Sequence, residues 1–261
     1  MATSQPIDPS AQNQRDEGMM TLREHLVEFR WRLTISVVAI LVCSLTFWPF
    51  KDFIFDILQS PLGQDVHLQQ IEPTEAFFSF FKVAVLGGIG IASPVVLYQI
   101  MAYVSPGLYP NEKRIFYASI PAMLAMFFIG VMFCWFVILR FTLNFLTGFA
   151  PEDINTELSI DSYVSFVARM LLVVGLVFET PFAIFLLAKF RIVSAQRLKG
   201  FRRYAIVVIV ILAAVITPTP DPFTQMAVAI PMYALYELGV LLAGLARTEA
   251  PPASSESTSS S

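Results

Sequence analysis

Two glutamates lie deep inside apolar runs of this 261-residue chain, where a carboxylate can do chemistry. Glu179 stands in LLVVGLVFETPFAIFLLAKF with a proline two positions later, and Glu237 stands in AIPMYALYELGV. Each precedes a basic residue, Lys189 or Arg247, by ten positions, or about 15 Å of helix. We therefore expect both acids at one depth near the middle of a membrane, where a charged acid costs about 2.5–3.5 kcal/mol.

These two acids allow three interpretations. A neutral Glu179 carboxyl can bond a backbone carbonyl that Pro181 leaves free. Alternatively, Glu179 and Glu237 form a polar patch that receives a partner helix or a substrate. The third interpretation is a proton relay. Arg169 lies near the outer end of its run, and we expect it to extend to the membrane surface.

Two further acids, Glu28 and Glu112, lie in polar segments among basic residues. In TLREHLVEFRWRL, apolar residues recur at helical spacing, and an interfacial anchor helix with a Glu28–Arg32 ion pair of about 0.3–0.5 kcal/mol is one interpretation. In YVSPGLYPNEKR, Pro110 can open a helix and place Glu112 in its first turn, where the helix dipole favours an acid. Both acids are expected to be exposed, and they stand out because they lie on the side where the basic residues concentrate.

The composition indicates that membrane helices position these acids. The chain is 56% hydrophobic and 14% charged, whereas soluble domains are about 45–50% apolar and about 25% charged. Hydrocarbon requires helices of about 20 residues, because every backbone polar group must be paired within the protein. We expect an all-α membrane protein with six transmembrane helices at about 33–50, 82–104, 115–139, 163–188, 203–217 and 224–246.

One membrane domain at 21–247 is expected between two polar, disordered tails at 1–20 and 248–261. Most of the 17 Lys and Arg residues fall before the first span, after the last, and in the loops that follow the second and fourth spans. The other loops are acidic. This asymmetry predicts that both termini are cytoplasmic in a multi-pass protein.

Prolines and one short apolar run predict the overall shape of the helix assembly. Prolines lie within or near the ends of spans at Pro94, Pro121, Pro181 and Pro231. Tyr204 to Ile216 is only 13 residues, or about 20 Å, so Arg202 and Arg203 are expected to extend to the membrane surface. We expect kinked helices that form a concave, glove-like wall with short fifth and sixth spans.

Several function classes receive no support. The net charge of -3 does not favour nucleic acid, and no GxGxxG, Walker, HExxH or CxxC pattern is present. His25 and His67 are isolated, and Cys43 and Cys134 lie in apolar runs, so we expect no metal, no disulfide and no cofactor. No Ser–His or paired-Asp arrangement at depth supports an intramembrane enzyme.

Four stretches resemble motifs of the TatC family. HLVEFRWRL resembles the pattern H-L-x-E-L-R-x-R-L, and SPGLYPNEKR resembles P-x-L-Y-x-x-E-x-R. FETPFAIFLL is similar to the fourth span of the family, and TPTPDPFTQ followed by AIPMYALYELGV is similar to its last outer turn and sixth span. The resemblance runs from about 20 to 247, with the motifs in the family order. It departs from the pattern at Phe29, Trp31 and Tyr103.

The resemblance implies the receptor subunit of the twin-arginine translocase, which moves folded proteins across the cytoplasmic (inner) membrane using the proton motive force. It implies that twin-arginine signal peptides bind at the inner face to Glu28, Arg30, Tyr103 and Glu112. Each arginine can hold a carboxylate through paired hydrogen bonds. Tyr103 can stack on a guanidinium group.

The resemblance also assigns the remaining sites and partners. Glu179 and Glu237 match the intramembrane acids of the family, and Asp221 matches an aspartate of its outer turn. TatA-like and TatB-like single-span proteins are implied along the fifth and sixth spans, in a receptor complex that holds several copies of the chain. From the residues alone, a small-solute secondary transporter is the alternative, although the repeated halves typical of that class are not visible.

Overall fold

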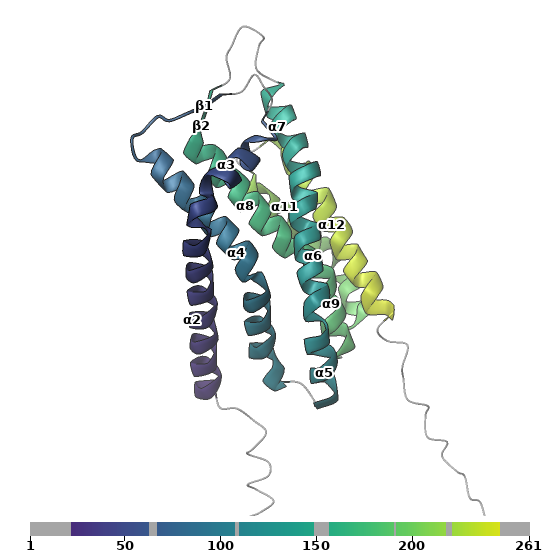
Figure 1. Ribbon diagram of the computed structural model, residues 1–261. Helices are drawn as coiled ribbons and strands as arrows, with labels where there is room; N and C mark the ends of the chain where they lie inside the picture. Colours follow the sequence, from purple (N-terminus) through teal and green to yellow (C-terminus); the bar gives the residue numbers. More distant parts are fainter. Residues whose placement is uncertain are drawn as a thin grey trace, which may run out of the picture.

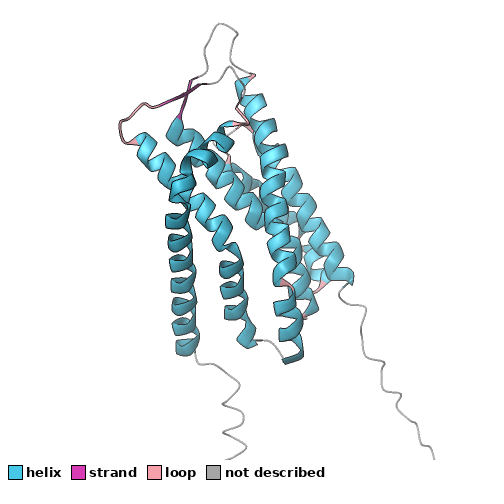
Figure 2. Ribbon diagram, viewed as in Figure 1, coloured by secondary structure: helices cyan, strands magenta, loops and turns pink. Residues whose placement is uncertain are grey.

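The computed structural model describes residues 22–62, 67–107, 110–148, 157–190, 192–217 and 221–245. Helices make up nearly all of these residues, with one short pair of strands (Figure 2). The expected tails at 1–20 and 248–261 lie outside the described residues.

The first half of the chain forms two long helices and the elements that join them. These are α2 (Leu22–Phe47), η1 (Trp48–Phe50), α3 (Lys51–Gln59), β1 (His67–Gln69), α4 (Glu75–Val104) and η2 (Ser105–Gly107). The second half holds α5 (Pro110–Ala118), α6 (Ile120–Phe133), the π-helical η3 (Cys134–Leu139), α7 (Arg140–Thr147), β2 (Glu157–Ser159), α8 (Ile160–Phe178), α9 (Thr180–Lys189), α10 (Ala195–Gly200), α11 (Arg202–Ile216) and α12 (Pro222–Leu245).

Five stretches among the described residues are long and apolar enough to cross a membrane. They are Arg23–Gln59, Glu75–Val104, Lys113–Leu146, Ile160–Lys189 and Pro222–Leu245. The expected fifth span is α11, whose 15 residues cover about 22 Å, less than the roughly 30 Å of hydrocarbon. The expectation of a short sixth span is wrong: α12 has 24 residues, or about 36 Å, because it runs unbroken through Pro231.

The first helix begins earlier than the expected boundary at 33. The segment 22–33 and the first span are one continuous helix, α2, with no separate interfacial helix. Between Leu22 and Phe47 the sequence contains no Gly or Pro, and the first helix breaker is Pro49 in η1. Residues of the amphipathic segment are therefore held rigidly by the span itself.

The helices run between two ends of the molecule (Figure 1). One end, here called the terminal end, carries the start of α2, the helix α5 and the end of α12. The opposite end, here called the strand end, carries α3, α7, β1 and β2. The strands pair in parallel, with His67 beside Glu157 and Gln69 beside Ser159. This ladder, which the all-α expectation did not include, ties two loops far apart in the sequence.

Neighbouring helices pack in the pairs α2–α4, α6–α8, α9–α12 and α11–α12. The first of these contacts depends on a small residue. A Cβ on Gly88 of α4 would come 2.6 Å from the Ser44 backbone nitrogen of α2, so only glycine permits this approach.

Two of the predicted helix breakers have visible effects on backbone bonding. Pro94 lies inside α4 and has no N–H to donate to the Gly90 carbonyl. The Ser93 hydroxyl donates a 2.7 Å hydrogen bond to that carbonyl instead. Pro181 stands at the start of α9, and the fourth span divides there at Glu179 into α8 and α9.

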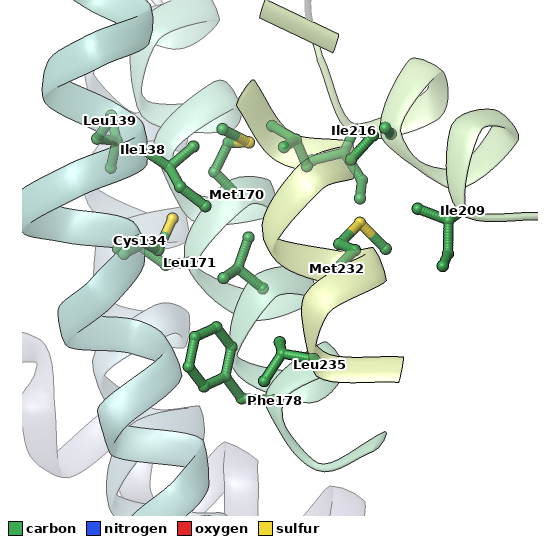
Figure 3. Close-up of a cluster of buried hydrophobic side chains, with 14 of the residues drawn as sticks. Cys134, Ile138, Leu139, Met170, Leu171, Phe178, Ile209, Ile216, Met232 and Leu235 are labelled. Carbon is green, nitrogen blue, oxygen red and sulfur yellow. The ribbon is translucent and has the colours of Figure 1, made fainter. Parts of the chain in front are cut away.

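The largest apolar cluster joins the second half of the molecule (Figure 3). It includes Cys134 of η3, Met170 of α8, Ile216 of α11 and Met232 of α12, which the view shows facing one another across these helices. The short α11 is therefore anchored in the core even though it is too short to cross the hydrocarbon.

Candidate functional site

A polar cluster at the terminal end joins α2 to α4. The Arg32 guanidinium donates to Glu28 Oε1 from Nη2 at 2.9 Å and from Nε at 3.1 Å, and to Gln99 Oε1 from Nη1 at 3.0 Å. The Glu28 side chain is only 16% exposed. Its second oxygen, Oε2, is buried and has no hydrogen-bond partner among the described residues. The expected i,i+4 pair is present, and it leaves one carboxylate oxygen unused.

An aromatic cluster lies beside this ion pair. The Tyr103 ring, at the end of α4, stacks on the His25 ring with centroids 4.4 Å apart and contacts the Phe29 ring at 5.3 Å. Arg30 is exposed on α2. The isolated His25 is thus a ring partner of Tyr103, a role that its sequence position did not indicate.

Glu112 is the third residue of α5, as its expected place in a first turn requires. Its side chain lies outside the described residues. The fold brings α5 to the same end of the molecule as Glu28 (Figure 1).

Glu179 lies at the junction of α8 and α9 and is buried, with 8% of the residue exposed. Neither carboxylate oxygen has a hydrogen-bond partner in the part of the chain that the structure describes. No hydrogen bond from this carboxyl to a carbonyl freed by Pro181 is present among the described residues, and the interpretation that predicts one stays a prediction. The Glu179 carbonyl itself accepts from the Ala183 N–H at 2.8 Å, so α9 starts without help from the side chain.

Glu237, in contrast, is fully engaged. Its Oε2 accepts from Arg202 Nη2 at 2.7 Å and its Oε1 accepts from the Tyr233 hydroxyl at 2.9 Å. Arg202 is the first residue of α11, so this helix begins beside the last third of α12, eight residues before its end. The Arg202 guanidinium, which we expected to extend to the membrane surface, pairs with a carboxylate within reach, and its position relative to the membrane stays a prediction.

The two intramembrane acids do not face each other. A Cβ on Gly239 of α12 would lie 3.1 Å from Pro181 Cα, so the Gly239 side of α12 contacts α9. Glu237 is two residues earlier, about 200° around the helix, and points to α11 instead. Glu179 thus stands alone on the α9 side, and the expected shared polar patch is absent from the described residues.

Asp221 caps α12. Its Oδ1 accepts from the Thr224 N–H at 2.7 Å, and its Oδ2 accepts from the buried Thr224 hydroxyl. Pro222 follows as the first helical residue. The sequence contains a signal for this capping role, because Asp221 precedes a proline and an apolar run. The family resemblance had assigned Asp221 only to an outer turn.

Sequence reasoning missed a carboxylate at the strand end. Glu75 accepts from the Ile71 N–H at 2.7 Å, from the Asp161 N–H at 2.9 Å and from the Ser159 hydroxyl. Beside it, Lys82 pairs with Asp161. The contacts with Ser159 and Asp161 join residues about 80 positions apart, and no local sequence pattern indicates that such residues are close. A cavity of about 450 Å³ is lined in part by Glu75, Lys82, Ser159 and Asp161.

Among the described residues, no three His, Cys, Asp or Glu side chains gather as metal ligands do. The polar groups of the terminal end instead suit a cationic ligand that can donate hydrogen bonds.

Comparison with known proteins identifies the family. A family model described as "TatC: Sec-independent protein translocase protein (TatC)" matches residues 24–231. The chain is 37% identical over 229 residues to the Sec-independent protein translocase protein TatC of Carboxydothermus hydrogenoformans, covering 87% of this chain and 94% of that one. It is 37% identical over 232 residues to the TatC protein of Aquifex aeolicus, covering 87% and 96%.

A solved structure supports the same conclusion. The crystal structure of a twin arginine translocase receptor, TatC, matches with a TM-score of 0.78 at 36% identity, over 85% of this chain and 99% of that chain. The sequence and fold matches cover the same large share of the chain, and the chain therefore belongs to the TatC family of Sec-independent protein translocase proteins.

Proposed function

We propose that this chain is the receptor subunit that binds twin-arginine signal peptides at its terminal end. Glu28 carries the proposal, because Arg32 holds one of its oxygens while the other is buried without a partner among the described residues. An unsatisfied buried acceptor costs about 1–3 kcal/mol, and an incoming guanidinium relieves that cost. The chain is a transport protein and not an enzyme, as its family requires.

The neighbouring groups suit the second arginine of such a signal. Glu112 lies in the first turn of α5 at the same end and supplies another carboxylate. Tyr103, held by His25 and Phe29, presents a ring on which a guanidinium can stack. Arg30 is exposed on α2, two residues after Glu28, and is proposed to contribute to the same signal-peptide site.

The membrane orientation belongs to the same proposal. We place the terminal end in the cytoplasm, with 21–247 as one membrane domain and both tails on that side, in the cytoplasmic membrane. The cations Arg23, Lys113, Arg114 and Arg197 of the described residues lie in helices of that end, as the positive-inside rule requires. The bent and divided helices support the concave, glove-like wall along which the apolar part of a signal would lie.

Single-span TatA-like and TatB-like partners are proposed to dock on α11 and α12, and several copies of the chain to share one complex that exports folded proteins with the proton motive force. An apolar groove of about 220 Å³ between these helices is lined by Ile206, Val210, Met226, Ile230 and Tyr233. Because α11 is short, the groove opens beside a polar pair, Arg202 and Glu237, that a partner helix can bond.

Crosslinking tests the signal site. A twin-arginine signal carrying a photoreactive group is offered to membranes with wild-type chain or Glu28→Gln. A charge-assisted hydrogen bond contributes about 1.5–3 kcal/mol, so the variant should lose roughly tenfold or more in signal affinity. Replacing both signal arginines by lysines should weaken binding to the wild type similarly, because lysine lacks the planar fork.

Asp52→Asn is the matched control, since Asp52 is an exposed acid at the strand end that pairs with Lys51. It should leave crosslinking unchanged. Equal crosslinking of the lysine signal and the arginine signal would refute the proposed recognition. A small-solute transporter is not favoured, because the family is one of protein translocases.

A further inference from the structure

An apolar groove bordered by two cationic residues runs between α4 and α8, away from every residue proposed above. Its volume is about 240 Å³, and its apolar lining comes from Phe81, Val85, Leu86, Ile89, Ala168 and Leu172. Lys82 and Arg169 complete the lining. Lys82 lies seven residues, or about 10 Å, from the start of α4 at the strand end.

The groove continues toward the middle of the molecule. A second cavity of about 80 Å³ shares Leu86, Ile89 and Leu172 with it and extends to Phe128 and Val131 of α6. Ile89 lies about 21 Å along α4 from its first residue. The cations therefore stand toward the strand end and the apolar walls lead inward, which is the polarity of a lipid that enters with its headgroup at that end.

Both cations converge on one serine. Arg169 Nε donates to the Ser165 carbonyl at 3.1 Å, and Lys82 Nζ donates to the Ser165 hydroxyl at 2.8 Å while it pairs with Asp161. Within the described ranges, the terminal nitrogens of Arg169 form no hydrogen bond or ion pair. An exposed guanidinium with free donors beside an ammonium is suited to a phosphate.

The other side of Lys82 is acidic. Lys82 also lines the cavity of about 450 Å³ at the strand end, together with Glu72, Glu75 and Asp161. Three carboxylates beyond the proposed phosphate position disfavour a second anionic group and favour an ammonium group there.

We propose that this groove binds one phospholipid whose headgroup ends in a primary amine. Arg169 and Lys82 hold the phosphate, the amine faces Glu72 and Asp161, and one acyl chain lies along Val85, Leu86, Ile89 and Leu172.

Native mass spectrometry of the full chain in mild detergent tests the site. The chain is titrated with phosphatidylethanolamine, phosphatidylglycerol or diacylglycerol, and the bound lipid is counted. The wild type should bind one phosphatidylethanolamine about tenfold more tightly than either other lipid. Arg169→Gln should weaken that binding about tenfold, and Arg169→Lys should lose less because it keeps the charge.

Ala168→Phe fills the groove without touching either cation and should also release the lipid. Arg140→Gln is the matched control, since Arg140 is another exposed arginine near the strand end, where its guanidinium lies 5.8 Å from the Phe136 ring. It should leave lipid binding unchanged. Unaltered thermal unfolding would confirm that each variant is folded.

Three results would overturn the proposal. Equal binding of diacylglycerol would exclude the phosphate contact, and tighter binding of phosphatidylglycerol would exclude the amine. If Ala168→Phe lowered self-association or partner co-purification but not lipid binding, a protein segment rather than a lipid would occupy the groove.

Discussion

At the scale of single residues, Glu28, Glu179 and Glu237 differ in the hydrogen-bond partners that they have. Glu237 has a cation and a hydroxyl, Glu28 has a cation on one oxygen, and Glu179 has no partner among the described residues. A buried polar group without a partner destabilises a fold, so its presence indicates a function other than stability. Glu179 and the second oxygen of Glu28 are the positions where a binding partner would complete the bonding.

Replacing Glu179 by Leu separates stability from function. Removing an unbonded buried carboxyl should leave thermal stability unchanged or raise it, because a cost of about 1–3 kcal/mol disappears. Co-purification of single-span partners, or signal crosslinking, should nevertheless fall. Glu179→Gln keeps the size and a hydrogen-bonding group and should retain more of this binding. If the Leu variant binds partners and signal normally, Glu179 has no role in either.

At the scale of elements, helix starts are set by caps and breakers that the sequence shows. Asp221 with Pro222 starts α12, and Ser159 starts α8 by accepting from the Ser162 N–H. The fourth span divides where Glu179 precedes Thr180 and Pro181. The short α11 begins at Arg202, which pairs with Glu237, and it ends before Thr217, which is extended and precedes Pro218 in the sequence.

Asp221→Ala should weaken α12 at its first turn. Loss of an N-cap costs about 0.5–2 kcal/mol, and here the buried Thr224 hydroxyl also loses its acceptor. Thermal unfolding in detergent should show a lower Tm. Asp221→Asn is the matched control because it retains a side-chain acceptor, and it should stay near the wild type. Equal Tm values for the Ala and Asn variants would contradict a capping role.

At the scale of the whole molecule, charge and topology agree. Basic residues gather at the terminal end, while the strand end is held by the acids Glu75 and Asp161, which tie α4 to α8. This arrangement predicts that the molecule is oriented in a membrane with its basic terminal end in the cytoplasm.

Cysteine labelling tests the orientation. In a background with Cys43→Ala and Cys134→Ala, an impermeant maleimide should label Asp56→Cys, in α3 at the strand end, in intact cells. Lys199→Cys, in α10, should react only after the inner membrane is opened. The reverse pattern would place the terminal end outside and remove the proposed signal site from the cytoplasm.

Composition, apolar run length and helix signals were enough to predict the membrane class, the approximate spans and the short α11. These properties are local, so each can be seen in a window of about 20 residues. The family motifs added residues such as Glu28 and Glu112, whose proposed roles stay predictions. The depth of Glu179 and Glu237 could be predicted from spacing, but their directions could not, because direction depends on which neighbour each helix packs against.

The sequence by itself determined that this protein is a set of apolar helices carrying a few costly acids, because hydrocarbon leaves the backbone no other choice. Only the tertiary structure decided which acids are satisfied. Arg202 reaches Glu237 from 35 positions away, Gln99 reaches Arg32 from 67, and Asp161 reaches Glu75 from 86. These contacts depend on how the helices pack side by side, which no local pattern of residues specifies.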